Sequence, residues 1–492
     1  MKKVILCLSI VLLVFSCVFG NGSPEEQQLF FDMLRQQQSY GSSSSATSYN
    51  TSTSTSSSSS VGSEIIARDM AALQRLYLYL DKNFLYEIDY DKVYEAMATA
   101  MFDALDDKYT YYVTAEASDD YASEISGKYG GLGIYFSKTY VDYQNPEDES
   151  TVYCIITQVF PNTPSSKAGL IAGDLITHID GEPVNDLEAT ECAKRMKGTA
   201  GSKVELTIKR KNTTFSIELV REVITVPTVE YEMVDSNIAY LRILEFSTGT
   251  KTASKEALAT LENEGMTGLI LDLRDNPGGD VEVTLSIADM FISDKILLNV
   301  EYKDKTKNKT YKASSGTYVD SKVNVVILIN EGTASSAEIL SSTMRDNGRA
   351  VLLGATSYGK GVMQAISSFG EGYTSVTTAS FLPPSGTVIH KEGVKPDIEV
   401  PTLVVTEEET EAYLELLKGT ALEDFVASNP QYTPENVAAF VSSQKESGVR
   451  EEVLAVAIRN EYYSNMSAEE KPIADVVYDP QLKAAYEYLT DK

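Results

Sequence analysis

The stretch VNVVILINEGTASSAEIL, residues 323–340, contains the pattern that decides the fold. Its first part, Val323–Ile329, is an almost uninterrupted apolar run, which is typical of a strand buried on both faces. A turn of small and polar residues follows, and we expect a helix to begin there. This order of strand, turn and helix predicts an α/β domain whose polar groups gather at the carboxyl ends of the strands.

Two other segments repeat the same order. Upstream, the apolar run Thr267–Leu273 leads into RDNPGG, residues 274–279, and a helix is expected after it. Downstream, the run Ala350–Leu353 leads into GATSYGKGVMQ, residues 354–364. We therefore expect one α/β unit over residues 222–403, which is called the core domain below.

The turn that enters the predicted helix suits acyl-transfer chemistry. Ser335 is a candidate nucleophile, and the first N–H groups of a helix, such as that of Ser336, have no partner within the helix. Gly278 and Gly279 lack a side chain, so their backbone can approach closely and supply a second N–H to an oxyanion. Because Ser336 is also a serine, the pattern alone leaves the choice of nucleophile open.

A base for this chemistry is not obvious, because the chain has only two histidines, His178 and His390. His178 alternates with apolar residues in a predicted strand and is expected to be structural. A lysine can replace imidazole where burial leaves its amine neutral. Lys360, between two glycines in the turn after a predicted strand, is the candidate, although such a lysine is more often an ordinary loop residue.

Residues 128–221 form a second unit of short strands with one helix near Asp186–Met196. Its motifs resemble those of PDZ domains, and it is called the PDZ-like module below. They are GLGI (residues 131–134), PSSKAGL (164–170) and GDLITHIDG (173–181). The resemblance implies that the backbone at Leu132, Gly133 and Ile134 binds the C-terminal carboxylate of a peptide, which then adds as a strand to the sheet edge. A packing module without a ligand is the alternative.

Four motifs in order closely resemble those of the C-terminal processing peptidases, also called tail-specific proteases. They are DLRDNPGG (residues 272–279), GTASSAEIL (332–340), SYGKGVMQ (357–364) and PPSGTVIHKEGVKPDIEV (383–400). The resemblance covers roughly residues 64–403. It implies a crotonase-like protease domain, within a fold of the α/β class, that carries an inserted PDZ domain and flanking helical segments.

The same resemblance implies a role for each matching residue. Ser335 corresponds to the nucleophile, Lys360 to the general base and Gln364 to the glutamine that orients the lysine. Gly279 and Ser336 correspond to the backbone donors of the oxyanion hole. The family pattern is usually SASASE where this chain has TASSAE, residues 333–338. The spacing to Lys360 favours Ser335 over Ser336 as the nucleophile.

The N-terminal part predicts export. Lys2 and Lys3 precede the apolar run Val4–Phe19, which is short for a membrane span and typical of a secretion signal. We expect residues 1–20 to be a signal peptide; attachment of lipid at Cys17 is the alternative and would tether the protein to a membrane. The expected location is the periplasm or the cell envelope.

Flanking segments complete the organisation. Residues 21–62 are Ser-rich and predict a disordered linker. Residues 63–127 predict a small helical domain, with Ser63 as the cap of its first helix and Asp89 or Asp91 opening its second. Residues 404–492 predict a helical C-terminal region. The expected function of the helical domain is packing or contact with a second copy, since such domains can dimerise in the resembled family.

Composition excludes several classes of function. A formal charge of −29 argues against nucleic-acid binding and against docking on anionic membranes. Beyond the leader, Cys154 and Cys192 have no metal-binding spacing and are expected to be buried thiols, with a single bridge as the alternative. Two histidines make a His-rich metal site improbable, so neither metal nor organic cofactor is expected.

The sequence therefore predicts an exported serine endopeptidase that takes protein or peptide substrates by their C-termini and uses a Ser/Lys dyad. One alternative is a catalytically inactive PDZ scaffold that binds C-terminal peptides; the complete set of site residues argues against it. A crotonase-type acyl-CoA enzyme is a weaker alternative, because no adenine or phosphate site is evident.

Overall fold

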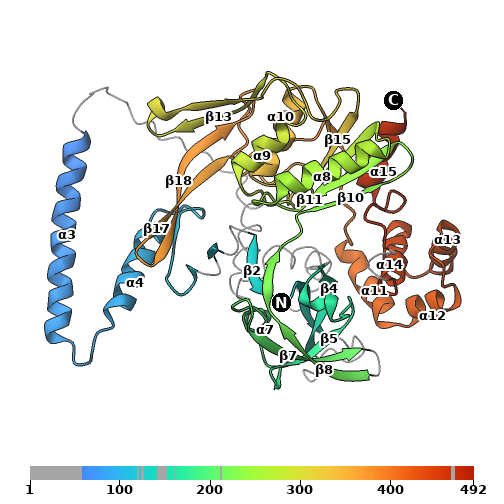
Figure 1. Ribbon diagram of the computed structural model, residues 1–492, viewed down its shortest axis with the longest axis horizontal. Coiled ribbons are helices and arrows are strands. Elements are labelled where there is room, and N and C mark those ends of the chain that lie inside the picture. The colour runs from blue at the N-terminus through green and yellow to red at the C-terminus, as the bar shows by residue number, and fades with distance from the viewer. Residues whose placement is uncertain are drawn as a thin grey trace. The chain divides into compact units, whose positions relative to one another are not determined.

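The computed structural model describes residues 58–118, 121–122, 127–140, 152–160, 162–210, 213–466 and 471–491 (Figure 1). These divide into two compact units. One lies within Asp119–Ala365 and Thr377–Lys492, and the other within Gly22–Ser118 and Ile366–Val376. The predicted signal peptide, residues 1–20, and most of the predicted linker are outside the described residues.

The core domain is built on a sheet of six strands in the order β10-β11-β12-β15-β16-β19. All neighbours are parallel except β10 and β11. The predicted buried runs are confirmed, because β12 and most of β15 are inaccessible to solvent. The strands are β10 (Val229–Met233), β11 (Ile238–Ile243), β12 (Gly268–Asp272), β15 (Asn324–Ile329), β16 (Val351–Gly354) and β19 (Ile398–Glu399).

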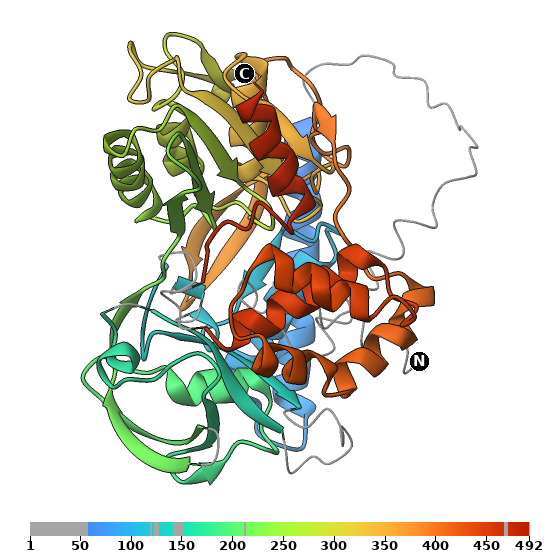
Figure 2. The ribbon, with the colours of Figure 1, turned by 90° about the vertical axis from the view of Figure 1, so that its right-hand side faces the viewer.

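Helices cover both faces of this sheet, as continuous apolar strands require. On one face Leu241, Leu271 and Ile327 pack against the apolar sides of three helices. On the other, Tyr240, Ile270 and Leu328 pack against α15, the dark red helix in Figure 2. The helices are α8 (Thr250–Asn263), α9 (Val281–Ala288), α10 (Ser336–Asp346) and α15 (Pro480–Thr490).

A second, smaller sheet is formed mainly by strands that lie between the core-sheet strands in the sequence. Within the first unit, β13 pairs antiparallel with β14 and with the last residues of β18. β17 pairs with β18 and begins directly after the predicted base Lys360. The bounds are β13 (Ile296–Tyr302), a 3-10 turn η2 (Lys305–Lys307), β14 (Lys309–Lys312), β17 (Val362–Phe369) and β18 (Gly372–Leu382).

The PDZ-like module has the predicted short strands and the predicted helix, α7, together with a four-residue helix, α6. Its strands pair in the order β3-β4-β5-β7-β8, β6 pairs with β5, and β2 pairs with β9. Cys154 and Cys192 are free thiols that are both fully buried in the module's core, as predicted. The elements are β2 (Lys128–Gly131), β3 (Ile134–Tyr140), β4 (Val152–Val159), α6 (Pro164–Lys167), β5 (Leu175–Ile179), β6 (Glu182–Pro183), α7 (Ala189–Met196), β7 (Lys203–Arg210), β8 (Thr213–Val220) and β9 (Glu222–Thr225).

The second unit holds both predicted N-terminal helices, α3 (Ser58–Asn83) and α4 (Tyr90–Asp103), and the short strand β1 (Tyr111–Val113). Asp89 caps α4 as expected, by accepting from the N–H of Lys92. Helix α3 begins at Ser58 and not at Ser63, since the apolar periodicity that predicts its start does not extend into the serine run. Its predicted apolar face, which includes Ile66 and Met70, is exposed to solvent in the single chain.

The C-terminal region is helical, as predicted, and packs around its own apolar cluster. Its helices are α11 (Glu407–Lys418), α12 (Ala421–Ser428), α13 (Pro434–Ser443) and α14 (Glu451–Ser464). Among all helices within the described ranges, none combines the length and apolarity that crossing a membrane requires.

One ion pair joins two of these helices. The Glu409 carboxylate accepts from the Arg450 guanidinium at 2.7 and 2.9 Å and from the Arg450 N–H at 3.0 Å. These contacts, with smaller contributions from Thr406, lower the pKa of Glu409 to about 2. A carboxylate whose pKa falls on folding stabilises the protein above the unfolded-state pKa of about 4.3 and loses that effect as the pH falls through the folded-state value.

We therefore expect Glu409→Gln to remove an acid-sensitive part of the stability of this region. The wild type should lose more thermal stability than the variant between pH 5 and about pH 2, measured by circular dichroism at helix wavelengths. Glu408→Gln, at the exposed neighbouring position on α11, is the matched control because it keeps the Glu409–Arg450 contacts. Its thermal stability should fall with pH as much as that of the wild type. Equal acid sensitivity in all three proteins would contradict the assignment.

Candidate active site

The turn between β15 and α10 holds Ser335 in an unusual backbone conformation. Ser335 has φ +54° and precedes the first residue of α10. Positive φ is uncommon for a residue with a side chain and is found where surrounding contacts enforce it. One of these contacts comes from Thr333, whose hydroxyl donates to the Leu273 carbonyl at 2.8 Å and accepts from the Asn330 N–H at 3.0 Å.

The neighbouring Ser336 has a different environment. It is fully buried, and its hydroxyl donates to the Gly279 carbonyl at 2.8 Å. The Ala334 N–H donates to the Asn276 carbonyl at 2.9 Å. These two bonds fasten the serine turn to the RDNPGG loop, so the segments predicted to supply the two oxyanion donors lie together.

Two glycines allow this close approach. A Cβ atom added to Gly278, which has φ +106°, would lie 2.8 Å from Ser335 Cβ. One added to Gly279, which has φ +132°, would lie 2.2 Å from the Phe246 carbonyl oxygen. Neither position can carry a side chain without moving the backbone. Among the described residues, no hydrogen-bond acceptor is found for the N–H of Gly279 or Ser336.

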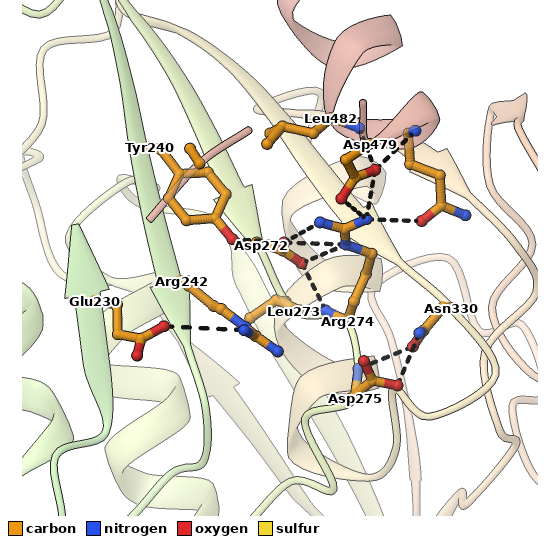
Figure 3. Close-up of polar contacts among 12 residues, drawn as sticks. Glu230, Tyr240, Arg242, Asp272, Leu273, Arg274, Asp275, Asn330, Asp479 and Leu482 are labelled. Carbon is orange, nitrogen blue, oxygen red and sulfur yellow. Dashed lines mark hydrogen bonds and ion pairs between the residues drawn. The ribbon is translucent and has the colours of Figure 1, made fainter. Parts of the chain in front are cut away.

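Buried side chains fix the shape of the RDNPGG loop. Asn276 is fully buried, donates to the Ile243 carbonyl and accepts from the Gly278 N–H, each at 2.8 Å. Asp275, with φ +60°, exchanges two hydrogen bonds of 2.9 Å with the Asn330 side chain, as Figure 3 shows. Because Asn330 follows β15, the ends of β12 and β15 are tied together.

One carboxylate connects the serine turn to the lysine turn. Oε2 of Glu338 accepts from the N–H of Ser335 at 2.7 Å and from the N–H of Lys360 at 2.8 Å. Oε1 accepts from the Ser357 hydroxyl at 2.5 Å and from the Gly359 N–H at 2.7 Å. The main chains at the predicted nucleophile and base are therefore neighbours, since they share a single oxygen atom.

This carboxylate is completely buried. Burial raises the pKa of Glu338 above its ordinary value, although the four donated hydrogen bonds act in the opposite direction. The four donors replace the water molecules that a buried carboxylate loses. An isolated buried carboxylate would have no such compensation.

Of the other predicted residues, Gln364 follows the lysine turn in the chain and His390 contacts that turn, whereas His178 lies in the PDZ-like module. Gln364, on β17, donates through its amide to the Thr377 hydroxyl on β18 at 3.1 Å. His390 is also adjacent to the lysine turn, because its Nδ1 atom accepts from the Gly361 N–H at 3.4 Å. His178 lies in the PDZ-like module on β5, where its Nδ1 atom is 3.0 Å from the Thr177 hydroxyl.

The predicted carboxylate-binding loop of the PDZ-like module is held through its carbonyl groups. The carbonyls of Leu132 and Gly133 accept from the N–H groups of Ser165 at 3.1 Å and Phe160 at 2.9 Å. Gly133 has φ +78°, and Ile134 begins β3. This anchoring leaves the N–H groups of Leu132 and Gly133 without an acceptor among the described residues.

Sequence reasoning assigned no role to Glu338, Asn276 or Ser357. A local signal existed for Glu338, because Ser335-x-x-Glu338 has the pattern of a capping box at a helix start. That pattern predicts the bond to Ser335 but not the three bonds to the lysine turn. No group of three or more His, Cys, Asp or Glu side chains able to hold a metal ion occurs in the described part of the chain.

Comparison with known proteins identifies two regions. Residues 237–400 match the sequence pattern of peptidase family S41, and residues 130–220 match that of the PDZ domain.

Relatives align over most of their length. The chain is 31% identical over 330 residues to the carboxy-terminal processing protease CtpA of Bacillus subtilis, covering 66% of this chain and 68% of the relative. It is 33% identical over 319 residues to a carboxy-terminal-processing protease of Bartonella bacilliformis, covering 63% and 70%. Among solved structures, the photosystem II D1 C-terminal processing protease aligns at 24% identity and a TM-score of 0.41, covering 71% of this chain and 90% of that one.

The bonds to Glu338 predict a large effect on stability. Glu338→Gln keeps the size of the side chain but places an amide N–H₂ against backbone donors, so buried N–H groups lose their acceptor. We expect the free energy of unfolding to fall by about 3 kcal/mol, measured by denaturant titration. Glu301→Gln, which removes a half-exposed pair with Lys305, is the control and should change it by less than about 0.5 kcal/mol. Equal effects of the two substitutions would refute the bridging role.

Proposed function

Because the chain belongs to peptidase family S41, and is a serine-type peptidase, we propose that it cleaves proteins or peptides near their C-termini with Ser335 as nucleophile and Lys360 as base. The observation that carries this proposal is the single Glu338 oxygen bonded to the main chains of both residues. The prediction of a peptidase with a PDZ domain is confirmed by the family matches, so the inactive scaffold and the acyl-CoA enzyme are set aside.

The surroundings of the two serines favour Ser335 over Ser336. The Ser336 hydroxyl is buried and donates to the Gly279 carbonyl, which removes it from chemistry. Ser335 is only half-buried and stands at the bend that enters α10. A nucleophile on such a bend presents its hydroxyl outside the regular hydrogen bonds of strand and helix.

In the proposed first step, the neutral Lys360 amine takes the proton from the Ser335 hydroxyl as its oxygen attacks the scissile carbonyl carbon. The resulting oxyanion accepts from the N–H groups of Gly279 and Ser336, and removal of one such donor typically lowers the rate by about 10²–10³-fold. Collapse breaks the C–N bond, and the leaving amine takes the proton from Lys360. An ester between Ser335 and the acyl part of the substrate remains.

In the second step Lys360 takes a proton from a water molecule that attacks the ester carbonyl. Collapse of the second tetrahedral intermediate releases the new carboxyl terminus and returns the proton to Ser335. We propose that Gln364 orients the lysine: its amide N–H donates to Thr377, which fixes the side chain and leaves the amide oxygen as an acceptor. Neither of these two proposed steps uses a metal ion or an organic cofactor.

Substrate recognition is assigned to the PDZ-like module. The N–H groups of Leu132, Gly133 and Ile134 would bind the terminal carboxylate, and the substrate would add as a strand to the edge of the module's sheet. The names of the relatives, which are carboxy-terminal processing proteases, support this specificity.

Several further points belong to the same proposal. The resemblance of the four motifs supports a crotonase-like core, and the apolar leader supports export to the periplasm or cell envelope, with lipid at Cys17 as the alternative to cleavage. The exposed apolar face of α3 supports a homodimer formed through that face.

The assignment of the nucleophile predicts a contrast between adjacent serines. Ser335→Ala should lower kcat by roughly 10⁴-fold or more, because no covalent intermediate can form. Ser336→Ala, the matched control, keeps its backbone N–H but loses the bond to the Gly279 carbonyl. It should lower kcat by roughly tenfold, far less than Ser335→Ala. Rates are measured with an unstructured polypeptide that has an apolar C-terminus. Loss of activity in Ser336→Ala alone would reverse the assignment.

Lys360→Ala and His390→Ala identify the base in the same assay. Lys360→Ala should abolish the acid limb of the pH–rate profile together with most of the activity, whereas His390→Ala should retain that limb. If activity survives in Lys360→Ala and disappears in His390→Ala, the base is the histidine.

Recognition of the tail predicts sensitivity to the terminal charge. Amidation of the substrate C-terminus should raise KM by roughly tenfold, because the backbone donors lose a charged acceptor. Gly133→Ala would place a Cβ atom 2.4 Å from the Thr163 side chain, so this variant should discriminate little between free and amidated tails. A wild-type enzyme that cleaves both substrates with equal KM would contradict the assignment.

A further inference from the structure

Arg274, the first residue of the RDNPGG loop, has a largely buried charged side chain with two sets of partners (Figure 3). The first set is Asp272, at the end of β12. Nε of Arg274 donates to both Asp272 oxygens at 3.0 Å, and Nη2 donates to Oδ2 at 2.6 Å. Burial acts to raise the pKa of Asp272, but the guanidinium outweighs it and holds that pKa below its ordinary value.

The second set of partners comes from the end of the chain. Nη1 of Arg274 lies 3.0 and 2.7 Å from the two oxygens of Asp479, and it donates to the Gln481 side chain at 3.2 Å. Both residues are at the start of α15. These three contacts of Nη1 therefore all depend on the C-terminal helix.

The same carboxylate also begins that helix. Asp479 is the N-cap of α15 and accepts from the N–H groups of Gln481 and Leu482, each at 3.0 Å. Downstream, Leu482, Ala485 and Leu489 are buried against the apolar face of the core sheet. The carboxylate is thus held at a fixed place by the helix that it caps.

Arg274 is well placed to transmit this restraint to the proposed oxyanion hole. The loop that it opens ends in Gly278 and Gly279, which lack the side chains that would restrict their backbone. The carbonyls of Gly278 and Gly279 accept from the Phe246 N–H and the Ser336 hydroxyl. The loop's own side chains add three further anchors: Arg274 on α15, Asp275 on Asn330, and Asn276 on Ile243. Only the first of these anchors comes from outside the core domain.

We propose that Asp479 is a positioning residue for catalysis, and that α15 braces the RDNPGG loop through Arg274 so that the Gly279 N–H points at the oxyanion. This inference rests on the proposed function. Residues 479–482 lie outside the segment that matches peptidase family S41. In this proposal, α15 restrains the position of the Gly279 N–H from outside that segment.

The substitution Asp479→Asn tests the brace with little change to the helix. Asparagine is as good an N-cap as aspartate, so α15 keeps its start, while the charged partner of Arg274 is lost. Tyr486→Phe is the matched control on the same helix. It removes the bond of the Tyr486 hydroxyl to Asp235 at 2.8 Å, which docks α15 without touching the loop.

With the unstructured polypeptide substrate, we expect Asp479→Asn to lower kcat by roughly tenfold and to leave KM within about twofold, because a misplaced donor affects the transition state more than substrate binding. A peptide boronate, which forms a tetrahedral adduct with the serine, should lose affinity in parallel with kcat. Binding of the cleaved product peptide should not change. Tyr486→Phe should differ from the wild type by less than twofold in every value, and Asp479→Glu should recover part of kcat.

The outcomes separate this inference from the proposed function. An active Ser335→Ala variant would refute the proposed nucleophile. An inactive Ser335→Ala variant together with wild-type kcat in Asp479→Asn would refute the brace alone. Equal loss of kcat in Asp479→Asn and Tyr486→Phe would also refute it, since docking of α15 in general would then be the cause. If Asp479→Asn does not fold, Gln481→Met takes its place. This variant removes the other contact to Nη1 together with the bond of the Gln481 amide to the Val400 carbonyl at 2.8 Å, so kcat should fall while Tyr486→Phe, which also loses one docking bond of α15, stays at the wild-type value.

Discussion

The buried carboxylate of Glu338 is the interaction on which the proposed site depends. It accepts four hydrogen bonds, and three of them come from the turn that contains Lys360. Removing a charge from water is costly unless the group is fully hydrogen-bonded, so this position is stable only when both turns are in place. The proposed nucleophile Ser335 and the proposed base Lys360 lie in separate turns, and folding of the core domain brings the main chains of these turns together.

The sheet explains why one carboxylate can reach both turns. β12, β15 and β16 are neighbouring parallel strands, so the segments that follow them emerge at the same edge. The RDNPGG loop, the serine turn and the lysine turn are those three segments. Close contact then requires residues without side chains, which Gly278 and Gly279 provide, and the Ser336 hydroxyl fastens the first two segments to each other.

Much of this arrangement could be predicted because it is encoded locally. Continuous apolar runs such as Thr267–Leu273 identify buried strands, and residues that follow them are expected at one sheet edge. The links made by Glu338 and Asp479 could not be predicted, because a carboxylate in sequence carries no information about a partner far along the chain. The start of α3 was also misplaced, since serines neither extend an apolar stripe nor exclude a helix.

A carboxylate close to the proposed base Lys360 raises an electrostatic question, because a nearby negative charge favours the ammonium form of a lysine and so opposes its action as a base. The geometry around Glu338 reduces this conflict. Its oxygens accept from the backbone N–H groups of Ser335, Gly359 and Lys360 and from one hydroxyl, so much of the charge is balanced by dipoles that do not move during the reaction. The carboxylate therefore fixes the backbone of the lysine turn through hydrogen bonds from main-chain N–H groups.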